Sequence, residues 1–215
     1  VAFLCSEEGL RRLERAGARI ARPLVAVTGI GRGTDAMRMA DRPHLGYDDF
    51  MRHYATEQER SSDETRAYYR RLWDRGTRYP GVHSFRAGRT AGNLAWQMAG
   101  ISDPLHQLDF IELHDAYTSS ELQTYEDLGL CRYGEGGPFA ASGKAFMPGL
   151  DYGLDLPEKP VCPVNPSGGL IACGHPVGAT GSFWAASAGT SATRRCRSRA
   201  RAAAPSIRTP EPGPM

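Results

Sequence analysis

The chain has 215 residues, of which 40% are hydrophobic and 23% are charged, a composition typical of a folded globular protein. No run approaches the roughly 18 apolar residues that a membrane-spanning helix needs, and no secretory signal pattern opens the chain, so we expect a cytoplasmic protein without membrane insertion. The five cysteines are scattered, odd in number and without a C-x-x-C pair, which argues against a disulfide framework and a zinc ribbon.

The chain is predicted to begin with a strand and a helix. A short apolar run over residues 1–5 precedes Ser6, which can cap a helix over residues 6–17. A second apolar run, PLVAVTGIGRG, predicts a strand that enters a glycine-rich loop over residues 23–33. The loop lacks the third glycine of a dinucleotide-binding fingerprint and a clear acidic residue about 20 positions later. We therefore interpret it as a turn after a strand.

The middle of the chain is predicted to contain two helices. Residues 41–88 are rich in arginine, tyrosine and acidic residues, and ETRAYYRRLWDR predicts a surface helix over 64–75 whose aromatic side chains belong to the core or to a lid. The segment GRTAGNLAWQMAGI, residues 88–101, has small and apolar residues at helical spacing. The ISDP that follows Gly100 indicates the end of this helix.

A strand and a helix are predicted next, before a long loop. LDFIELHDAY, residues 108–117, is suited to a buried strand, and SSELQTYEDLGL predicts a helix capped by Ser119 or Ser120. Residues 132–160 are rich in glycine and proline and are predicted to be a loop. The alternation of strands and helices predicts a layered α/β fold with a largely parallel sheet.

The last segments differ in character. PVNPSGGLIACGHPVGATG, residues 163–181, predicts a tight glycine loop that opens into a closely packed helix. Residues 191–215 contain six arginines, one acidic residue and no aromatic residue, and cannot bury enough apolar surface to offset the entropy of ordering. We expect residues 190–215 to be a disordered basic tail, without specific nucleic-acid recognition.

Two histidines are placed where catalytic groups are common. His114 follows an apolar run, at the carboxyl end of a predicted strand, the edge at which open parallel sheets gather ligand sites. His175 lies among glycines at a predicted helix N-terminus, where a neutral imidazole can bind an oxyanion or accept a thiol proton. The alternative is that His175 merely caps a turn. The remaining histidines are interpreted as structural.

Cys173 is the local candidate for a nucleophile. It precedes His175 by two residues, and acyl transfer through a thioester requires an activated thiolate. The alternative is that Cys173 is a small packed residue. No metal site is predicted, because Cys131, Cys162, Cys173 and His175 lack the spacing of ligand pairs.

Two long motifs resemble those of a known family. NPSGGLIACGHPVGATG resembles the glycine–histidine–proline motif of thiolases, and HDAYTSSELQTYEDLGLC resembles the HDAF motif of their sterol-carrier-protein-type branch. VAFLCSEEGLRRL is similar to the end of the thiolase N-terminal half, and PLVAVTGIGRGTDAM to the first strand of the C-terminal half. The resemblance implies the end of the N-terminal half over residues 1–22, an incomplete C-terminal domain over 23–189, and a tail over 190–215.

The resemblance implies acyl-CoA chemistry, either Claisen condensation or thiolysis of a 3-oxoacyl-CoA, with the coenzyme A thioester as substrate and no bound cofactor. It implies that His175 activates the nucleophilic cysteine and contributes to an oxyanion hole, and that His114 orients the water or substrate oxygen of that hole. Asp115 would shape the loops. The other residues that it implicates in shaping the oxyanion loop are Asn165, Gly168, Gly169, Gly174 and Gly178.

The chain departs from the family pattern at both catalytic cysteines. No C-x-S nucleophile is present, and the arginine-rich tail stands where a C-x-G cysteine is expected, as a frameshift in GC-rich DNA would produce. We expect little activity from the chain alone, and a homodimer or a partner that supplies the N-terminal half. Two alternatives are a truncated, partner-binding fragment and a thiolase-like aldolase subunit with a small accessory protein. In the latter Tyr117 would act as acid or base, or would simply pack half-buried.

Overall fold

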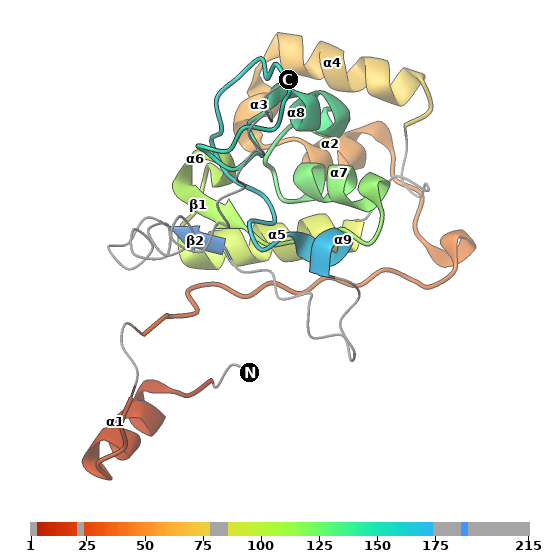
Figure 1. The fold of residues 1–215 in the computed structure, drawn as a ribbon. Helices are drawn as coiled ribbons and strands as arrows, with labels where there is room; N and C mark the ends of the chain where they lie inside the picture. The colour runs from red at the N-terminus through yellow and green to blue at the C-terminus, as the bar shows by residue number, and fades with distance from the viewer. Residues whose placement is uncertain (1–3, 21–23, 78–85, 174–185, 189–215) are drawn as a thin grey trace, which may run out of the picture.

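The computed structural model describes residues 4–20, 24–77, 86–173 and 186–188 (Figure 1). Helix α1 stands apart from the other elements, and none of its residues is buried. The elements follow in the order α1 (Glu7–Arg15), α2 (Tyr47–Tyr54), α3 (Glu57–Ser61), α4 (Asp63–Asp74), α5 (Arg86–Ala99), α6 (Pro104–Gln107), β1 (Leu108–Ile111), α7 (Thr118–Asp127), α8 (Gly136–Ser142), α9 (Gly169–Cys173) and β2 (Ala186–Ala188).

Three of the predicted helices are confirmed, with ends set by local chemistry. The Ser6 hydroxyl accepts a hydrogen bond from the Gly9 amide at 3.1 Å, which caps α1 as its sequence predicts. The predicted surface helix over 64–75 is α4. The helix predicted over 88–101 is α5, and Gly100 follows its last residue with φ +70°, a conformation that glycine adopts without a Cβ clash.

Two predictions around α7 and α8 are wrong in detail. Helix α7 begins at Thr118, so the two serines predicted as caps lie within its first turn, where the Ser120 hydroxyl donates to the Tyr117 carbonyl at 2.7 Å. Helix α8 forms inside the segment predicted to be a loop. Its first residue, Gly136, lies so close to α7 that a Cβ there would stand 2.5 Å from the Leu122 carbonyl oxygen. Close helix packing therefore uses a glycine that the sequence alone suggests is a loop residue.

The described residues contain an antiparallel pair of strands. Strand β1 pairs with β2, with Leu108 opposite Ala188. One isolated bridge, between Ile111 and Val164, is parallel. The expected largely parallel sheet is thus represented in the described part of the chain by this single bridge, because the other predicted strands do not form ladders there. The described fold is helical layers around one short strand pair.

The glycine-rich segment 23–33 was predicted to be a strand and a turn, and both predictions are wrong for the described residues 24–33. This segment runs extended along α5 without being assigned as a strand. A Cβ at Gly29, Gly31 or Gly33 would stand 2.3, 1.7 or 2.1 Å, respectively, from the carbonyl oxygens of Ala95, Ala91 and Ala87. Glycines two residues apart in the extended segment therefore lie against alanines four residues apart on one face of α5. The repeat provides close backbone packing rather than a turn.

Two hydrophobic clusters form the core. The first surrounds β1 and includes Ile111, Tyr125, Leu128 and Phe139. The second consists of aromatic and apolar residues of α2 and α4 together with Tyr133, which follows α7. We call Tyr47–Asp74 the α2–α4 unit. Its aromatic side chains belong to the core, which answers the question left open by the sequence.

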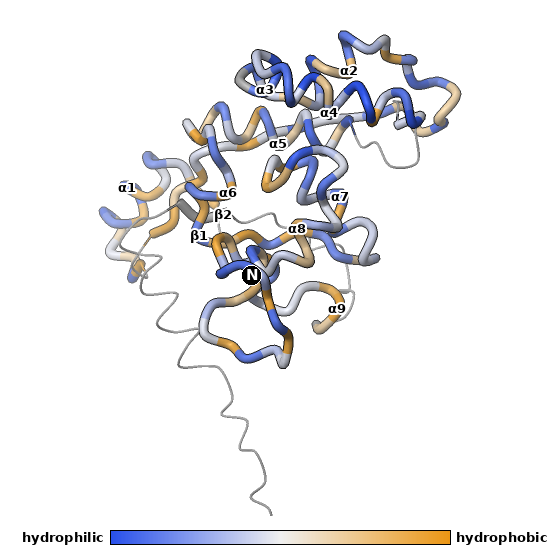
Figure 2. Tube along the Cα trace, turned by 90° about the horizontal axis from the view of Figure 1, so that it is seen from above, coloured by the Kyte–Doolittle hydropathy of each residue, from blue (hydrophilic) through white to orange (hydrophobic). Residues whose placement is uncertain are grey.

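The residues of α4 are largely hydrophilic, whereas those of α9 are mostly hydrophobic (Figure 2). Ile171 of α9 is 65% exposed in the described part of the chain. No described helix combines the length and apolar character required to cross a bilayer.

Candidate functional site

The two sequence motifs meet at the carboxyl end of β1. The Ile111 amide donates to the Pro163 carbonyl at 2.9 Å, and the Asn165 amide donates to the Ile111 carbonyl at 2.8 Å. We call residues 112–117 and 163–173 the paired motif loops. The end of the strand therefore anchors the second loop through main-chain hydrogen bonds.

Asn165 connects the paired motif loops through its side chain. Its Oδ1 accepts a hydrogen bond from the Leu113 amide at 2.7 Å, and its carbonyl accepts one from the Gly168 amide at 2.8 Å. Its φ of +48° is a left-handed conformation that asparagine tolerates better than most residues. The side-chain acceptor and the unusual backbone angle explain why asparagine suits this position.

Two carboxylates add further hydrogen bonds between the loops. Glu112 accepts from the Ser167 amide at 2.9 Å and from the Ser167 hydroxyl at 2.7 Å. Asp115, which is only 2% exposed, accepts from the Leu170 amide at 2.6 Å in the first turn of α9. Charge-assisted hydrogen bonds of this kind are stronger than neutral ones. Sequence reasoning missed Glu112, and its position beside His114 gave no signal of this role.

The glycines of the second loop permit this close approach. Gly168 and Gly169 have φ angles of +99° and +59°. A Cβ on Gly169 would stand 2.1 Å from an oxygen of Asp115. The Asp115 carboxylate therefore fits against α9 only because residue 169 has no side chain.

His114 lies between the anchored residues of the first loop. Burial alternates from Ile111 to Ala116, as in an extended segment, and His114 itself is half-buried on the same side as Glu112. The Leu113 amide and the Asp115 carboxylate on either side of it are both bonded to the second loop. His114 is consequently held beside the glycine loop by its neighbours.

Several predicted site residues fall outside the described part of the chain. They are His175, Gly174 and Gly178. Cys173 is the last residue of α9, and its main chain alone is described. The structure therefore brings together His114, Asp115, Asn165, Gly168 and Gly169, and leaves the separation of the two histidines as a prediction.

Tyr117 does not pack as the sequence-based alternative predicts. Its side chain is 74% exposed, so it is not a half-buried core residue. Its main chain is fixed at the start of α7, where its amide donates to the Ser120 hydroxyl at 3.3 Å. The phenol is therefore accessible at the end of the first motif loop.

Cys131 and Cys162 do not provide an activated thiol. Cys162 is fully buried, and burial raises the pKa of the half-buried Cys131 thiol far above its ordinary value. A thiol acts as a nucleophile only when its pKa is low enough to give thiolate. Within the described residues, no group of three or more histidine, cysteine or acidic side chains is placed to hold a metal ion.

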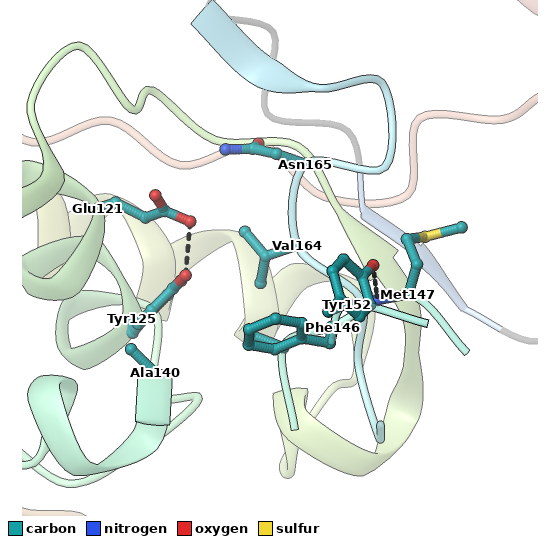
Figure 3. A pocket seen from close by; sticks show the side chains of 9 residues that line it. Glu121, Tyr125, Ala140, Phe146, Met147, Tyr152, Val164 and Asn165 are labelled. Atoms are coloured by element: carbon teal, nitrogen blue, oxygen red, sulfur yellow. Dashed lines mark hydrogen bonds between the residues drawn. The ribbon is translucent and has the colours of Figure 1, made fainter. Parts of the chain in front are cut away.

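A pocket adjoins the paired motif loops on the side of α7 (Figure 3). Val164 and Asn165 form part of its wall, and Glu121 and Tyr125 of α7 form another part. Sequence reasoning did not single out Glu121 or Tyr125, although their spacing of four places them on one helix face.

Comparison with known protein families gives one match over most of the chain. Residues 77–204 match the family described as thiolase C-terminal domain-like. The matched region contains both paired motif loops and begins after the α2–α4 unit. It ends within the segment predicted as a basic tail.

Similar proteins match over shorter stretches. Sterol carrier protein 2 of Bos taurus is 40% identical over 97 residues, which is 45% of this chain and 16% of that protein. The benzoylsuccinyl-CoA thiolase subunit BbsB of Thauera aromatica is 43% identical over 74 residues, 34% of this chain and 16% of that protein. The acetyl-CoA acetyltransferase of Methanocaldococcus jannaschii is 36% identical over 100 residues, 46% of this chain and 23% of that protein. The chain therefore spans between about a sixth and a quarter of these curated relatives.

Proposed function

The chain belongs to the thiolase C-terminal domain-like family, and we propose that it supplies the oxyanion-binding part of an acyl-CoA acyltransferase site. The reaction would be Claisen condensation of acyl-CoA thioesters or its reverse, thiolysis of a 3-oxoacyl-CoA. The coenzyme A thioester is the substrate, and no further cofactor is required.

The observation that supports this proposal most is the docking of the paired motif loops. Main-chain, amide and carboxylate hydrogen bonds join them at the end of β1. Stabilisation of a developing oxyanion requires donors that are already fixed before the reaction starts. A loop held by hydrogen bonds at several successive residues meets this requirement.

In this site His114 would donate a hydrogen bond, directly or through water, to the thioester oxygen as negative charge develops there. His175 would accept the proton of the attacking thiol and bind the same oxyanion region. Asp115 and Asn165 would position the loops without touching the reacting atoms. Gly168, Gly169, Gly174 and Gly178 would let the main chain approach the substrate.

The nucleophilic cysteine is proposed to come from elsewhere. Burial makes Cys131 and Cys162 unsuitable as nucleophiles, and we retain Cys173 only as an alternative nucleophile. The proposed arrangement is an assembly with a chain that carries a thiolase N-terminal half, because a homodimer of this chain would leave Cys173 as the nucleophile. The name of the Thauera aromatica relative, a thiolase subunit, supports an assembly of more than one chain.

Acetoacetyl-CoA cleavage tests this proposal. The chain alone should not cleave the substrate in the presence of coenzyme A. The chain mixed with a separately expressed N-terminal half of the Methanocaldococcus jannaschii acetyl-CoA acetyltransferase should cleave it slowly, because the mixture regains the C-x-S nucleophile but still lacks the C-x-G cysteine. In that mixture, His114→Ala should lower the rate by about 10²–10³, the usual effect of removing one oxyanion donor.

His106→Ala is the matched control, because His106 is exposed on α6 and bonded to Asp103 rather than to the paired motif loops. Cleavage of acetoacetyl-CoA by the chain alone would refute the proposal that its site is incomplete. An inactive mixture would refute the proposed assembly with an N-terminal half. A mixture that is equally active with either variant would refute the assigned role of His114.

A second candidate function is supported by Tyr117. An exposed phenol three residues after His114 is available as a proton donor or acceptor in a thiolase-like aldolase subunit that works with a small accessory protein. Tyr117→Phe separates the two reactions. It should abolish retro-aldol cleavage of a 3-hydroxyacyl-CoA and leave thiolysis unchanged, whereas unchanged retro-aldol cleavage would exclude the role of the phenol.

A third candidate is partner binding without catalysis. On the extended segment beside α5, Val25, Val27 and Ile30 are 88%, 61% and 69% exposed, and such apolar side chains favour association with another chain. A monodisperse monomer at high concentration would argue against this alternative.

A further inference from the structure

The pocket beside α7 has walls of apolar and aromatic side chains from four parts of the chain. Glu121 and Tyr125 of α7 face Val164 and Phe146 across it (Figure 3). The remaining lining residues are Ala140, Ala145, Met147, Tyr152 and Asn165. Concave sites lined mainly by apolar groups, with a few placed polar groups, are typical of small-molecule binding.

Glu121 is the only charged residue of this lining as described. One of its carboxylate oxygens accepts a hydrogen bond from the Tyr125 hydroxyl. Burial, followed by this hydrogen bond, raises the pKa of Tyr125 well above its ordinary value, so the phenol remains protonated and keeps donating. The Tyr125 hydroxyl thereby orients the Glu121 carboxylate.

The aromatic walls are held by their own contacts. The rings of Phe146 and Tyr152 meet edge to face with centroids 4.7 Å apart, and the Tyr152 hydroxyl accepts a hydrogen bond from the Met147 amide at 3.1 Å. On the opposite wall, the Tyr125 ring packs edge to face on Phe139 at 5.1 Å. A pocket whose rings are already fixed loses little entropy when a ligand enters.

We propose that this pocket binds an organic cation with a small apolar or aromatic body, whose ammonium group pairs with Glu121. Aromatic faces attract cations, and a carboxylate within the same pocket adds a charge-assisted hydrogen bond. The same carboxylate repels anions, so the pocket is unsuited to the phosphates of coenzyme A. The inference does not depend on the proposed acyltransferase activity.

Three ligands of nearly equal shape test the predicted charge preference on the full-length chain. They are 2-phenylethylammonium, 2-phenylethanol and 3-phenylpropionate, titrated at neutral pH while amide chemical shifts are followed by NMR. The ammonium ligand should bind about tenfold more tightly than the alcohol, in line with one charge-assisted contact, and the carboxylate should bind most weakly. Equal affinities, tighter binding of the carboxylate, or no saturable binding would overturn the proposal.

Two substitutions locate the binding. Glu121→Gln keeps an oxygen for the Tyr125 hydroxyl but removes the charge, and should abolish the tenfold preference for the ammonium ligand. Glu64→Gln, on the exposed surface of α4, is its control and should retain the preference.

Ala140→Leu should fill the pocket and reduce binding of both the ammonium and the alcohol at least tenfold. Ala141→Leu, its neighbour on α8 with an exposed side chain, should not. Loss of binding in both leucine variants, or in neither, would place the ligand elsewhere. The unfolding midpoint of each variant checks that α8 remains folded.

Discussion

The α2–α4 unit and the paired motif loops differ in what holds them in place. The α2–α4 unit depends on buried rings: Phe50, Tyr54 and Tyr69 have no exposed surface, and the Tyr54 and Tyr133 rings lie 4.2 Å apart. The paired motif loops depend on directed hydrogen bonds to amides, with Glu112 and Asp115 as acceptors. Burial of apolar side chains stabilises the packing of the α2–α4 unit against its neighbours, whereas directed hydrogen bonds set the orientation of the paired motif loops.

Arg89 joins the α2–α4 unit to the rest of the molecule. It is 6% exposed, and its guanidinium donates to the carbonyls of His53, Tyr54 and Glu126 at 2.8, 2.6 and 2.7 Å. These carbonyls lie at the ends of α2 and α7, where main-chain acceptors lack helical partners. A substitution in the α2–α4 unit should therefore change global stability, and one in the paired motif loops should change local order.

The largest expected effect is that of Phe50→Ala. It removes a fully buried ring that contacts Tyr54, Tyr69, Trp73 and Tyr133, and should lower the free energy of unfolding by about 3–5 kcal/mol. Urea denaturation followed by circular dichroism measures the change. A loss below about 1 kcal/mol would mean that the aromatic cluster contributes little to global stability.

Asp115→Ala should have a smaller and more local effect. It removes the charge-assisted hydrogen bond to the half-buried Leu170 amide, which costs about 1–3 kcal/mol. Hydrogen exchange at Leu170 should accelerate while exchange in α4 stays unchanged. Asp151→Ala is the control, because Asp151 is exposed and bonds only locally to the Gly153 amide. Equal acceleration in α4 would show that the two regions unfold together.

Asp127 and His53 give a pH dependence near the junction made by Arg89. Burial raises the pKa of Asp127 to about 8, whereas burial, with Arg89 and Arg86 nearby, lowers the pKa of His53 to about 4. Neutral Asp127 is favoured in the folded state, so its contribution is lost as pH rises from its unfolded value towards 8. Neutral His53 is also favoured, so its contribution is lost as pH falls below 6.5.

Between pH 6.5 and 8, Asp127 alone of these two groups changes stability. The free energy of unfolding should fall by about 1–2 kcal/mol across this interval, and the fall should disappear in Asp127→Asn. Denaturant midpoints at a series of pH values measure it. The same slope in the variant would assign the effect to another group.

Gly31→Ala should have the smallest effect on global stability. The added methyl group would lie 1.7 Å from the Ala91 carbonyl oxygen, so the extended segment must move away from α5, at an expected cost of about 1 kcal/mol. Cleavage of residues 24–34 by a protease should accelerate. Gly46→Ala, where nothing lies within 4 Å of an added Cβ, should leave cleavage unchanged and serves as the control.

Helices were predicted best because their signals are local. The Ser6 cap, the spacing of α5 and the Gly100 stop all act within a turn or two, and the structure places α1 and α5 accordingly. The predicted strand and turn over 23–33 are wrong because alternating glycines fit both a strand and a chain packed against a helix. The choice depends on α5, more than 50 residues later in the sequence.

By itself the sequence determined helices α1, α4 and α5, the family and the two motifs that carry His114 and His175, because each depends on residue types at fixed short spacings. Only the tertiary structure revealed the hydrogen bonds of Glu112, the exposure of Tyr117, the anchoring by Arg89 and the pocket at Glu121. Each of these depends on which distant segments meet, and short-range patterns do not specify such meetings. From the sequence alone, a carboxylate such as that of Glu112 cannot be distinguished from an ordinary surface residue, because its amide partner lies in a distant segment.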